Sequence, residues 1–262
     1  MKSLFKSTAV AVAVLAGLAG GQVANAASGV TFLIGSDVVS FHRDASFINP
    51  FVDQMANFGS KKLLFVGDRV STNYTNGNVA ITFETRATWD SAPSLAGFSG
   101  VYFDSPSGCC SDPGPALLAS TAASVAAFVA AGGSLGVGDY QGATFWDSIL
   151  GFTGLPGMTG GRATDGFLCE DPGVSTPGGL AFGFNASYSE GCFIHQTYNP
   201  AFWAGHGYFA LQTDGAGSSR HDDWVTMATG FRDPGTVPEP GSIALVGLAL
   251  AAGAAGLKRR KA

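Results

Sequence analysis

The chain has 262 residues, of which 46% are hydrophobic and only 13% charged, with 38 glycines and a formal net charge of −5. Because average chains carry about 25% charged residues, this composition excludes a disordered charged chain and a coiled coil. It also argues against a nucleic-acid partner, since phosphate contacts need clustered Lys and Arg side chains. We therefore expect one exported globular domain, or two small ones.

The segment 1–26 has the three parts of a secretory signal peptide. Lys2 and Lys6 supply the positive end, an apolar run follows from Ala9 to Ala19, and Ala24-Asn25-Ala26 matches the small-residue cleavage site. The apolar run is too short to span a bilayer comfortably. We predict cleavage after Ala26, with an uncleaved N-terminal anchor as the alternative.

Residues 27–236 are predicted to form the exported domain, and its first half alternates strands with helices. The expected strands are 30–34, 62–66, 79–83, 100–103 and 135–138, and the expected helices are 44–58, capped by Asp44, and 116–131. Short apolar strands separated by helices are typical of a parallel sheet that is covered on both faces. The pattern predicts an α/β fold with a doubly wound, mostly parallel sheet.

Polar side chains follow the expected strands at the edge where such folds bind ligands. The candidate ligand-binding residues are Asp37, His42, Asp68, Asp104, Asp139 and Tyr140. The alternative is that these residues form turns and cap helices, for which Asp, Ser and Gly are well suited.

Residues 95–154 resemble class I glutamine amidotransferase-like domains, in which a helix, a Gly-Gly pair, a strand and a sharp turn follow one another. The match lies in Val125 to Gly138 and in the turn Gly138-Asp139-Tyr140-Gln141-Gly142. The resemblance implies a flavodoxin- or amidotransferase-like sheet. Tyr140 stands where catalytic members have their nucleophilic cysteine, and a phenol with a pKa near 10 is a poor substitute for a thiolate, so amidotransferase chemistry is not expected.

The second half of the domain, from about residue 155, is rich in Gly, Pro and Thr and predicts a β-rich extension. All four cysteines lie in the exported domain, where an oxidising compartment permits disulfides. We prefer a bond between Cys169 and Cys192. Cys109 and Cys110 can form a bond between neighbours, stay reduced, or pair one each with the other two.

The C-terminal segment, 237–262, combines a proline motif, a short apolar run and a basic cluster. The motif is Val237, Pro238, Glu239 and Pro240, and the basic membrane stop is Lys258, Arg259, Arg260 and Lys261. The run between them, 243–257, covers roughly 22 Å as a helix, less than the roughly 30 Å of a bilayer core. Such a transmembrane helix is a weak permanent anchor and a suitable temporary one.

This tail resembles the PEP-CTERM sorting signal. The resemblance implies processing by an exosortase, a membrane-embedded cysteine transpeptidase of Gram-negative bacteria, after transient anchoring in the inner membrane. It further implies delivery to the cell surface or the extracellular matrix. An ordinary single-pass anchor is the alternative. Removal of both ends leaves 8 basic and 18 acidic residues, so the net charge of the mature domain falls to −10.

The sequence thus predicts an exported binding or structural module in an exopolysaccharide or biofilm setting, with an extracellular hydrolase as the alternative. The hydrolase would use strand-end Asp residues and one of the four histidines, which are His42, His195, His206 and His221. No catalytic residue, cofactor or metal site is assigned, because the chain has no familiar nucleophile or metal-ligand motif. A hydrolase must gather a histidine, a carboxylate and a nucleophile or metal in one place, whereas scattered histidines would exclude it.

Overall fold

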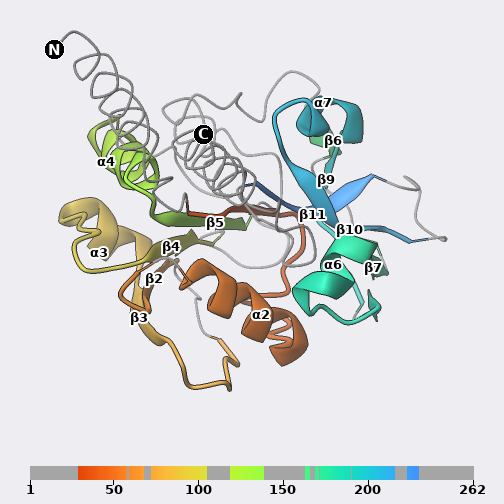
Figure 1. Ribbon diagram of the computed structural model, residues 1–262, viewed down its shortest axis with the longest axis horizontal. Coiled ribbons are helices and arrows are strands. Elements are labelled where there is room, and N and C mark those ends of the chain that lie inside the picture. Colours follow the sequence, from red (N-terminus) through yellow and green to blue (C-terminus); the bar gives the residue numbers. More distant parts are fainter. Residues whose placement is uncertain are drawn as a thin grey trace, which may run out of the picture. The chain divides into compact units, whose positions relative to one another are not determined.

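The computed structural model describes residues 29–57, 59–67, 72–104, 119–138, 163–165, 169–170, 172–189, 191–215 and 223–229. These residues form one sheet of eleven strands with helices packed against it (Figure 1). The strand order is β3-β2-β4-β5-β1-β11-β10-β7-β8, and β9 branches from β11 to pair with β6.

Five strands at one end of the sheet are parallel to one another. They are β1 (Thr31–Ile34), β2 (Lys62–Val66), β3 (Ala80–Glu84), β4 (Gly100–Phe103) and β5 (Ser134–Gly138). All residues of β1, β4 and β5 are buried. Strands that are covered on both faces need side chains without charge at every position, which explains their unbroken runs of apolar and small residues.

The remaining strands come from the second half of the chain and pair antiparallel. They are β6 (Ala163–Asp165), β7 (Gly173–Ser175), β8 (Ser187–Tyr188), β9 (Thr197–Tyr198), β10 (Phe209–Asp214) and β11 (Trp224–Thr229). The junction between the two halves is the antiparallel pair of β1 with β11, in which Phe32 lies opposite Ala228. The last described strand therefore pairs directly with the first.

The prediction of a doubly wound, mostly parallel α/β fold is wrong. Six of the ten strand pairings among the described residues are antiparallel, so the sheet is mixed. The physical reason is that the short second-half strands do not form a separate extension but continue the main sheet beyond β1. The predicted C-terminal transmembrane helix falls outside the described residues. No helix within the described ranges is long and apolar enough to cross a membrane.

One face of the sheet is covered by α2 (Ala45–Met55) and α6 (Pro177–Phe182). The predicted cap of α2 is confirmed, because the Asp44 side chain accepts a hydrogen bond from the Ser46 amide at 2.8 Å. Phe51 of α2 packs edge-on against Phe32 of β1, with ring centroids 5.0 Å apart. Phe182 of α6 meets the same Phe32 ring at 5.5 Å. A chain of aromatic rings thus joins both helices to the first strand.

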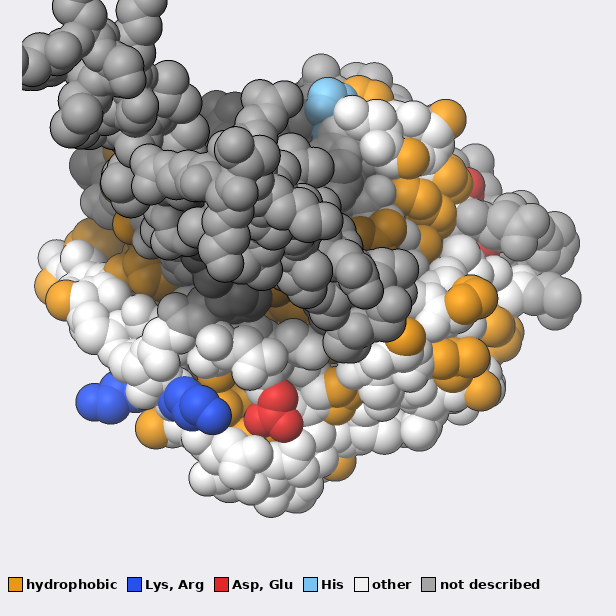
Figure 2. Space-filling model, viewed as in Figure 1, with side chains coloured by type: hydrophobic (Ala, Val, Ile, Leu, Met, Phe, Trp, Pro, Cys, Tyr) orange, Lys and Arg blue, Asp and Glu red, His pale blue; other side chains and the backbone are white. Residues whose placement is uncertain are grey.

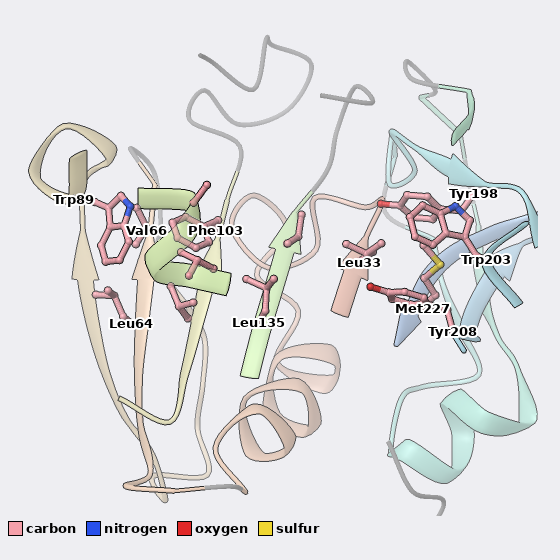
Figure 3. Close-up of a cluster of buried hydrophobic side chains, with 14 residues drawn as sticks. Leu33, Leu64, Val66, Trp89, Phe103, Leu135, Tyr198, Trp203, Tyr208 and Met227 are labelled. Carbon is pink, nitrogen blue, oxygen red and sulfur yellow. The ribbon is translucent and has the colours of Figure 1, made fainter. Parts of the chain in front are cut away.

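The opposite face carries α3 (Arg86–Ser91), α4 (Ala119–Ala130) and α7 (Pro200–Ala204). Its buried cluster contains Leu33 and Leu135 from the central strands, Trp89 of α3 and Trp203 of α7 (Figure 3). Because side chains alternate across a strand, Phe32 and Leu33 serve the two separate cores. Burial of about 25 cal/mol for each Å² of apolar surface makes these two layers the main source of stability.

Charged side chains are sparse on the described part of the surface in Figure 2, as the low charged fraction predicts. Hydrophobic side chains are scattered among polar ones on this face. Large hydrophobic side chains with substantial exposure among the described residues are Phe41, Phe83 and Leu180. Scattered single apolar residues are normal on protein surfaces, but the exposed Phe41 ring lies against the ring of His42.

Candidate functional site

The carboxyl ends of β4, β5 and β1 meet at one edge of the sheet, because these strands are parallel neighbours. Asp104 directly follows β4, Gly138 ends β5, and Asp37 stands three residues beyond β1. Both carboxylates are buried, with 2% and 0% of the surface of Asp104 and Asp37 exposed. The described polar residues at this edge form two connected groups.

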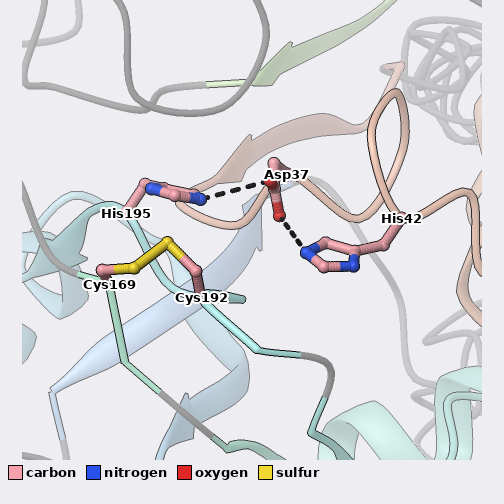
Figure 4. The surroundings of a disulfide bond; sticks show 5 residues. All are labelled: Asp37, His42, Cys169, Cys192 and His195. Atoms are coloured by element: carbon pink, nitrogen blue, oxygen red, sulfur yellow. Dashed lines mark ion pairs between the residues drawn. A yellow bond between two sulfur atoms is a disulfide. The ribbon is translucent and has the colours of Figure 1, made fainter.

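The first group is centred on Asp37, whose two carboxylate oxygens face two histidines (Figure 4). Asp37 Oδ1 lies 3.1 Å from His42 Nε2, and Asp37 Oδ2 lies 3.2 Å from His195 Nε2. His195 is completely buried, whereas 12% of the His42 side chain is exposed. A buried carboxylate is thus held between one buried and one partly accessible imidazole.

A tight turn after β1 places His42 on Asp37. The amides of Phe41 and His42 both donate to the Asp37 carbonyl, at 3.0 and 3.3 Å. This closes the chain on itself, so that the His42 ring returns to the side chain of the residue that began the turn. Arg43, which follows, has a left-handed backbone with φ of 53° and turns the chain toward the cap of α2.

Opposing effects act on the Asp37 carboxyl group. Burial alone raises its pKa, because the charged form loses water. Hydrogen bonds to His195 and His42, and the positive charge of these rings when protonated, lower it. The pKa of Asp37 is lowered overall from its ordinary value, so the carboxylate is ionised at neutral pH.

The second group is centred on Asp104. Its carboxylate accepts hydrogen bonds from the Ser40 hydroxyl and, at 2.8 Å, from the Tyr102 hydroxyl. Ser40 belongs to the same turn as Asp37 and His42, so Asp104 ties that turn to β4. Gly138 ends β5, the strand between β4 and β1, and a Cβ atom there would stand 2.6 Å from Tyr102 Oη. Glycine therefore leaves the room that this contact needs.

The segment 192–196 delivers His195 from the second half of the chain. The amides of His195 and Gln196 both donate to the Gly35 carbonyl, at 2.8 and 2.9 Å. Ile194 forms isolated bridges with Ser36 on one side and with Glu170 on the other. The predicted Cys169–Cys192 disulfide is confirmed and lies beside this segment (Figure 4).

Three of the six predicted ligand-binding residues fall within the described part of the chain. Asp37 and His42 are in contact, and Asp104 lies at the end of β4, with β5 between β4 and β1, and is joined to Ser40 of the same turn. Asp68, Asp139 and Tyr140 lie outside the described residues, as do Cys109, Cys110, the sorting motif and the basic membrane stop. His206 packs on Phe202 after α7, with ring centroids 4.7 Å apart, and His221 is outside the described ranges.

Sequence reasoning did not assign His195, Ser40 and Tyr102 to the site. The only signal for His195 is that it is one of four histidines and lies three residues after the predicted disulfide at Cys192. Within the described ranges, no group of three or more His, Cys, Asp or Glu residues is arranged to hold a metal ion. The described geometry suits proton transfer, because a carboxylate that orients an imidazole makes a general acid–base pair.

Comparison with known proteins identifies one segment. The family model for the PEP-CTERM protein-sorting motif matches residues 236–261. No curated protein and no solved structure matches the chain, so no match supports the amidotransferase-like resemblance of residues 95–154. The matched motif supports a secreted protein that is anchored transiently in the membrane and processed by an exosortase.

Proposed function

We propose that the mature domain is an extracellular hydrolase in which Asp37 orients His42 as the general base. The observation that carries this proposal is the placement of ionised Asp37 between His42 and His195 at the carboxyl edge of parallel strands. The hydrolase alternative requires a histidine, a carboxylate and a nucleophile or metal in one place. Two of the four histidines meet one carboxylate here, and in this proposal water is the nucleophile.

The chemistry follows from the atoms that face one another. A neutral imidazole has one N–H donor and one nitrogen with a lone pair. Because Nε2 of His42 faces Asp37, that nitrogen carries the proton and Nδ1 carries the lone pair. Nδ1 can take a proton from water as the water oxygen attacks a carbonyl or glycosidic carbon, and Asp37 stabilises the imidazolium that forms. The bond from that carbon to the leaving group then breaks, and the leaving group takes up a proton from the imidazolium or from solvent. No protein nucleophile is needed for such a step.

Burying the Asp37 carboxylate costs free energy, and this cost supports a functional role for it. Removing a carboxylate from water is expensive, and apolar residues of similar size at such positions are often equally or more stabilising. The sheet around Asp37 is already packed with apolar side chains on both faces. A buried Asp–His pair that the core does not require is therefore expected to serve chemistry.

The test is a substrate screen with the exported, processed protein. It would cover chromogenic esters, glycosides and peptides, followed by His42→Ala and the matched control His206→Ala. We expect one substrate class to be turned over, a loss of about 10²- to 10⁴-fold in His42→Ala, and no change in His206→Ala. Turnover that survives His42→Ala, or no turnover of any class, would refute the proposal.

A binding module at the cell surface or in an exopolysaccharide matrix is the second candidate, and Phe41 favours it. Its side chain is 54% exposed, and its ring lies edge-on to His42 with centroids 5.3 Å apart. An exposed aromatic ring offers a face on which a sugar can stack. Retardation in gels that contain neutral polysaccharide, lost in Phe41→Ala but kept in Phe83→Ala, would favour binding over hydrolysis.

The position of processing is tested separately. Mass spectrometry of the surface form should show that both the segment 1–26 and the tail from about Pro238 are gone. Replacement of Pro238 and Pro240 by Ala should leave the tail in place. Surface protein that still carries Lys258 to Ala262 would contradict exosortase processing.

A further inference from the structure

We propose that the Cys169–Cys192 disulfide is a strap that holds His195 against Asp37, so that the Asp37 centre is assembled only after export into an oxidising compartment. This inference concerns regulation of the site described above and rests on the proposed function for its biological meaning. Its structural content, the oxidation-dependent placement of His195, can be tested without any activity.

The disulfide joins two of three short segments that are paired by isolated bridges. Ile194 lies between Ser36, which follows β1, and Glu170. The Ile194 amide donates to the Glu170 carbonyl at 2.9 Å, while the neighbouring His195 amide donates to Gly35. Cys169 directly precedes Glu170, and Cys192 stands two residues before Ile194. The disulfide therefore links the segment that ends at Glu170 covalently to the segment that carries His195.

The pairing between Glu170 and Ile194 is short. Glu170 is held to Ile194 by two amide–carbonyl bonds, one of them long at 3.4 Å. The two cysteines are 23 positions apart in the sequence. Without the covalent bond, bringing the two ends of this loop together costs additional entropy, which weakens the pairing. Reduction is thus expected to release this segment before the rest of the sheet.

The backbone at Cys192 gives a second reason. Its φ of 65° lies in the left-handed region, which residues other than glycine adopt only when their surroundings hold them there. Its neighbour Gly191 lies in open space, since a Cβ atom added there would meet nothing within 4 Å. The bond to Cys169 is a covalent constraint on Cys192, so its loss should let residues 191–194 relax.

Movement of this segment would reach both histidines. His195 is completely buried and makes its contact with Asp37 through Nε2 at 3.2 Å. Phe193, in the same segment, packs against His42 with ring centroids 6.1 Å apart and stacks on Tyr188 at 5.7 Å. A displacement of 192–195 would therefore disturb both neighbours of the Asp37 carboxylate.

The disulfide is open to redox reagents, because Cys169 is exposed and Cys192 is half-buried. In the oxidising step each thiol loses one proton and one electron, and the S–S bond forms. A disulfide-bearing protein oxidant takes up both electrons and both protons and becomes a dithiol. Before export, in a reducing compartment, the two cysteines stay as thiols and the disulfide is not formed.

Amide hydrogen exchange of the full exported chain tests the strap. The reporters are the amides of His195 and Gln196. The control is the Asp104 amide, which donates to the carbonyl of Val66 at the end of β2. We expect reduction by a dithiol to speed exchange at the two reporters at least about tenfold while Asp104 keeps its rate. Reoxidation should restore protection.

Two variants make the result specific to this bond. Cys169→Ser with Cys192→Ser should behave like the reduced protein, whereas Cys109→Ser with Cys110→Ser should leave the reporters unchanged and still responsive to reduction. If the first variant does not fold, the reduced wild-type protein gives the same reading. Unchanged exchange at His195 and Gln196 after reduction would overturn the strap. A reduction-dependent change in a protein that hydrolyses nothing would instead overturn only the proposed function.

Discussion

Asp104, at the end of β4, accepts a hydrogen bond from Ser40, in the turn that follows β1, although β5 lies between these two strands. Ser40 stands two residues before His42 and three after Asp37. The contact therefore fixes the turn on which the Asp37–His42 pair depends. The polar group at β4 thereby supports the acid–base pair that follows β1.

Replacing Ser40 by Ala should weaken both the fold and the pair. Asp104 is buried and would lose one of its donors while it keeps the Tyr102 hydroxyl. Losing a donor to a buried acceptor costs about 1–3 kcal/mol in the free energy of unfolding. Urea denaturation measures this loss. Ser91→Ala removes an exposed hydroxyl that donates to the Thr88 carbonyl and should change stability by less than about 0.5 kcal/mol. Equal effects of the two substitutions would contradict this role for Ser40.

Replacing Gly138 by Ala should break the Tyr102–Asp104 contact by crowding it. The new Cβ would lie 2.6 Å from Tyr102 Oη and 2.8 Å from Asp104 Oδ1, closer than real Cβ contacts. Overpacking of this kind costs about 1–3 kcal/mol, measurable as a lower midpoint in thermal unfolding. Gly191→Ala is the matched control, because nothing lies within 4 Å of its added Cβ. A Gly138→Ala protein as stable as this control would show that Tyr102 can move away freely.

The local elements of the first half could be predicted from the sequence, but their assembly could not. The strands at 62–66 and 100–103 have the expected bounds, and Asp44 caps α2 as expected. These features depend on nearby residues, such as apolar runs between Gly and Asp. The pairing of β1 with β11 joins the first and the last strand of the described chain. A local sequence pattern does not indicate which distant strand will pair with β1. The fold class was wrong for that reason.

The candidate site divides in the same way. The sequence predicts Asp37, His42 and Asp104 as site residues because each follows a predicted strand, and a residue's place after a strand can be read from the sequence alone. His195 meets Asp37 from the other half of the chain, through a segment whose placement depends on Gly35 and on the disulfide. The sequence predicts the disulfide because export permits disulfides and because this pairing closes a Gly- and Pro-rich loop. Its use in placing a histidine was not visible.

Replacing Asp37 by Asn should remove a part of the acid dependence of stability. The pKa of Asp37 in the fold is below the ordinary value of 3.8. Above that pH both the folded and the unfolded carboxyl groups are ionised, so the stabilisation is complete. As the pH falls below 3.8, the unfolded state takes up the proton first and the stabilisation is lost progressively through the lowered pKa. Asn cannot titrate and loses nothing in this window.

The measurement is the free energy of unfolding of both proteins from neutral to acid pH. We expect the wild-type protein to be more stable by about 1–3 kcal/mol at neutral pH, from its contacts to His42 and His195, and the difference to shrink below pH 3.8. A difference that stays constant through the acid range would mean that the contacts with His195 and His42 do not lower the pKa of Asp37.

Tyr74 should produce the opposite pH dependence at the alkaline end. Burial, together with the hydrogen bond that its hydroxyl donates to Asp53 at 2.6 Å, raises its pKa to about 12. Between pH 10 and about 12 the unfolded tyrosine loses its proton while the folded one keeps it, so stability is complete below pH 10 and falls as the pH rises through this window. Tyr74→Phe has no proton to lose there. The stability advantage of the wild-type protein, about 1 kcal/mol at neutral pH from the hydrogen bonds that Tyr74→Phe loses, should therefore disappear in this range.

The Asp53→Asn variant tests the cause of the raised pKa. In Asp53→Asn the carboxylate charge is gone, and tyrosinate absorbance should then show Tyr74 ionising closer to pH 10. An unchanged titration in Asp53→Asn would show that burial alone, the larger cause, sets the pKa of Tyr74.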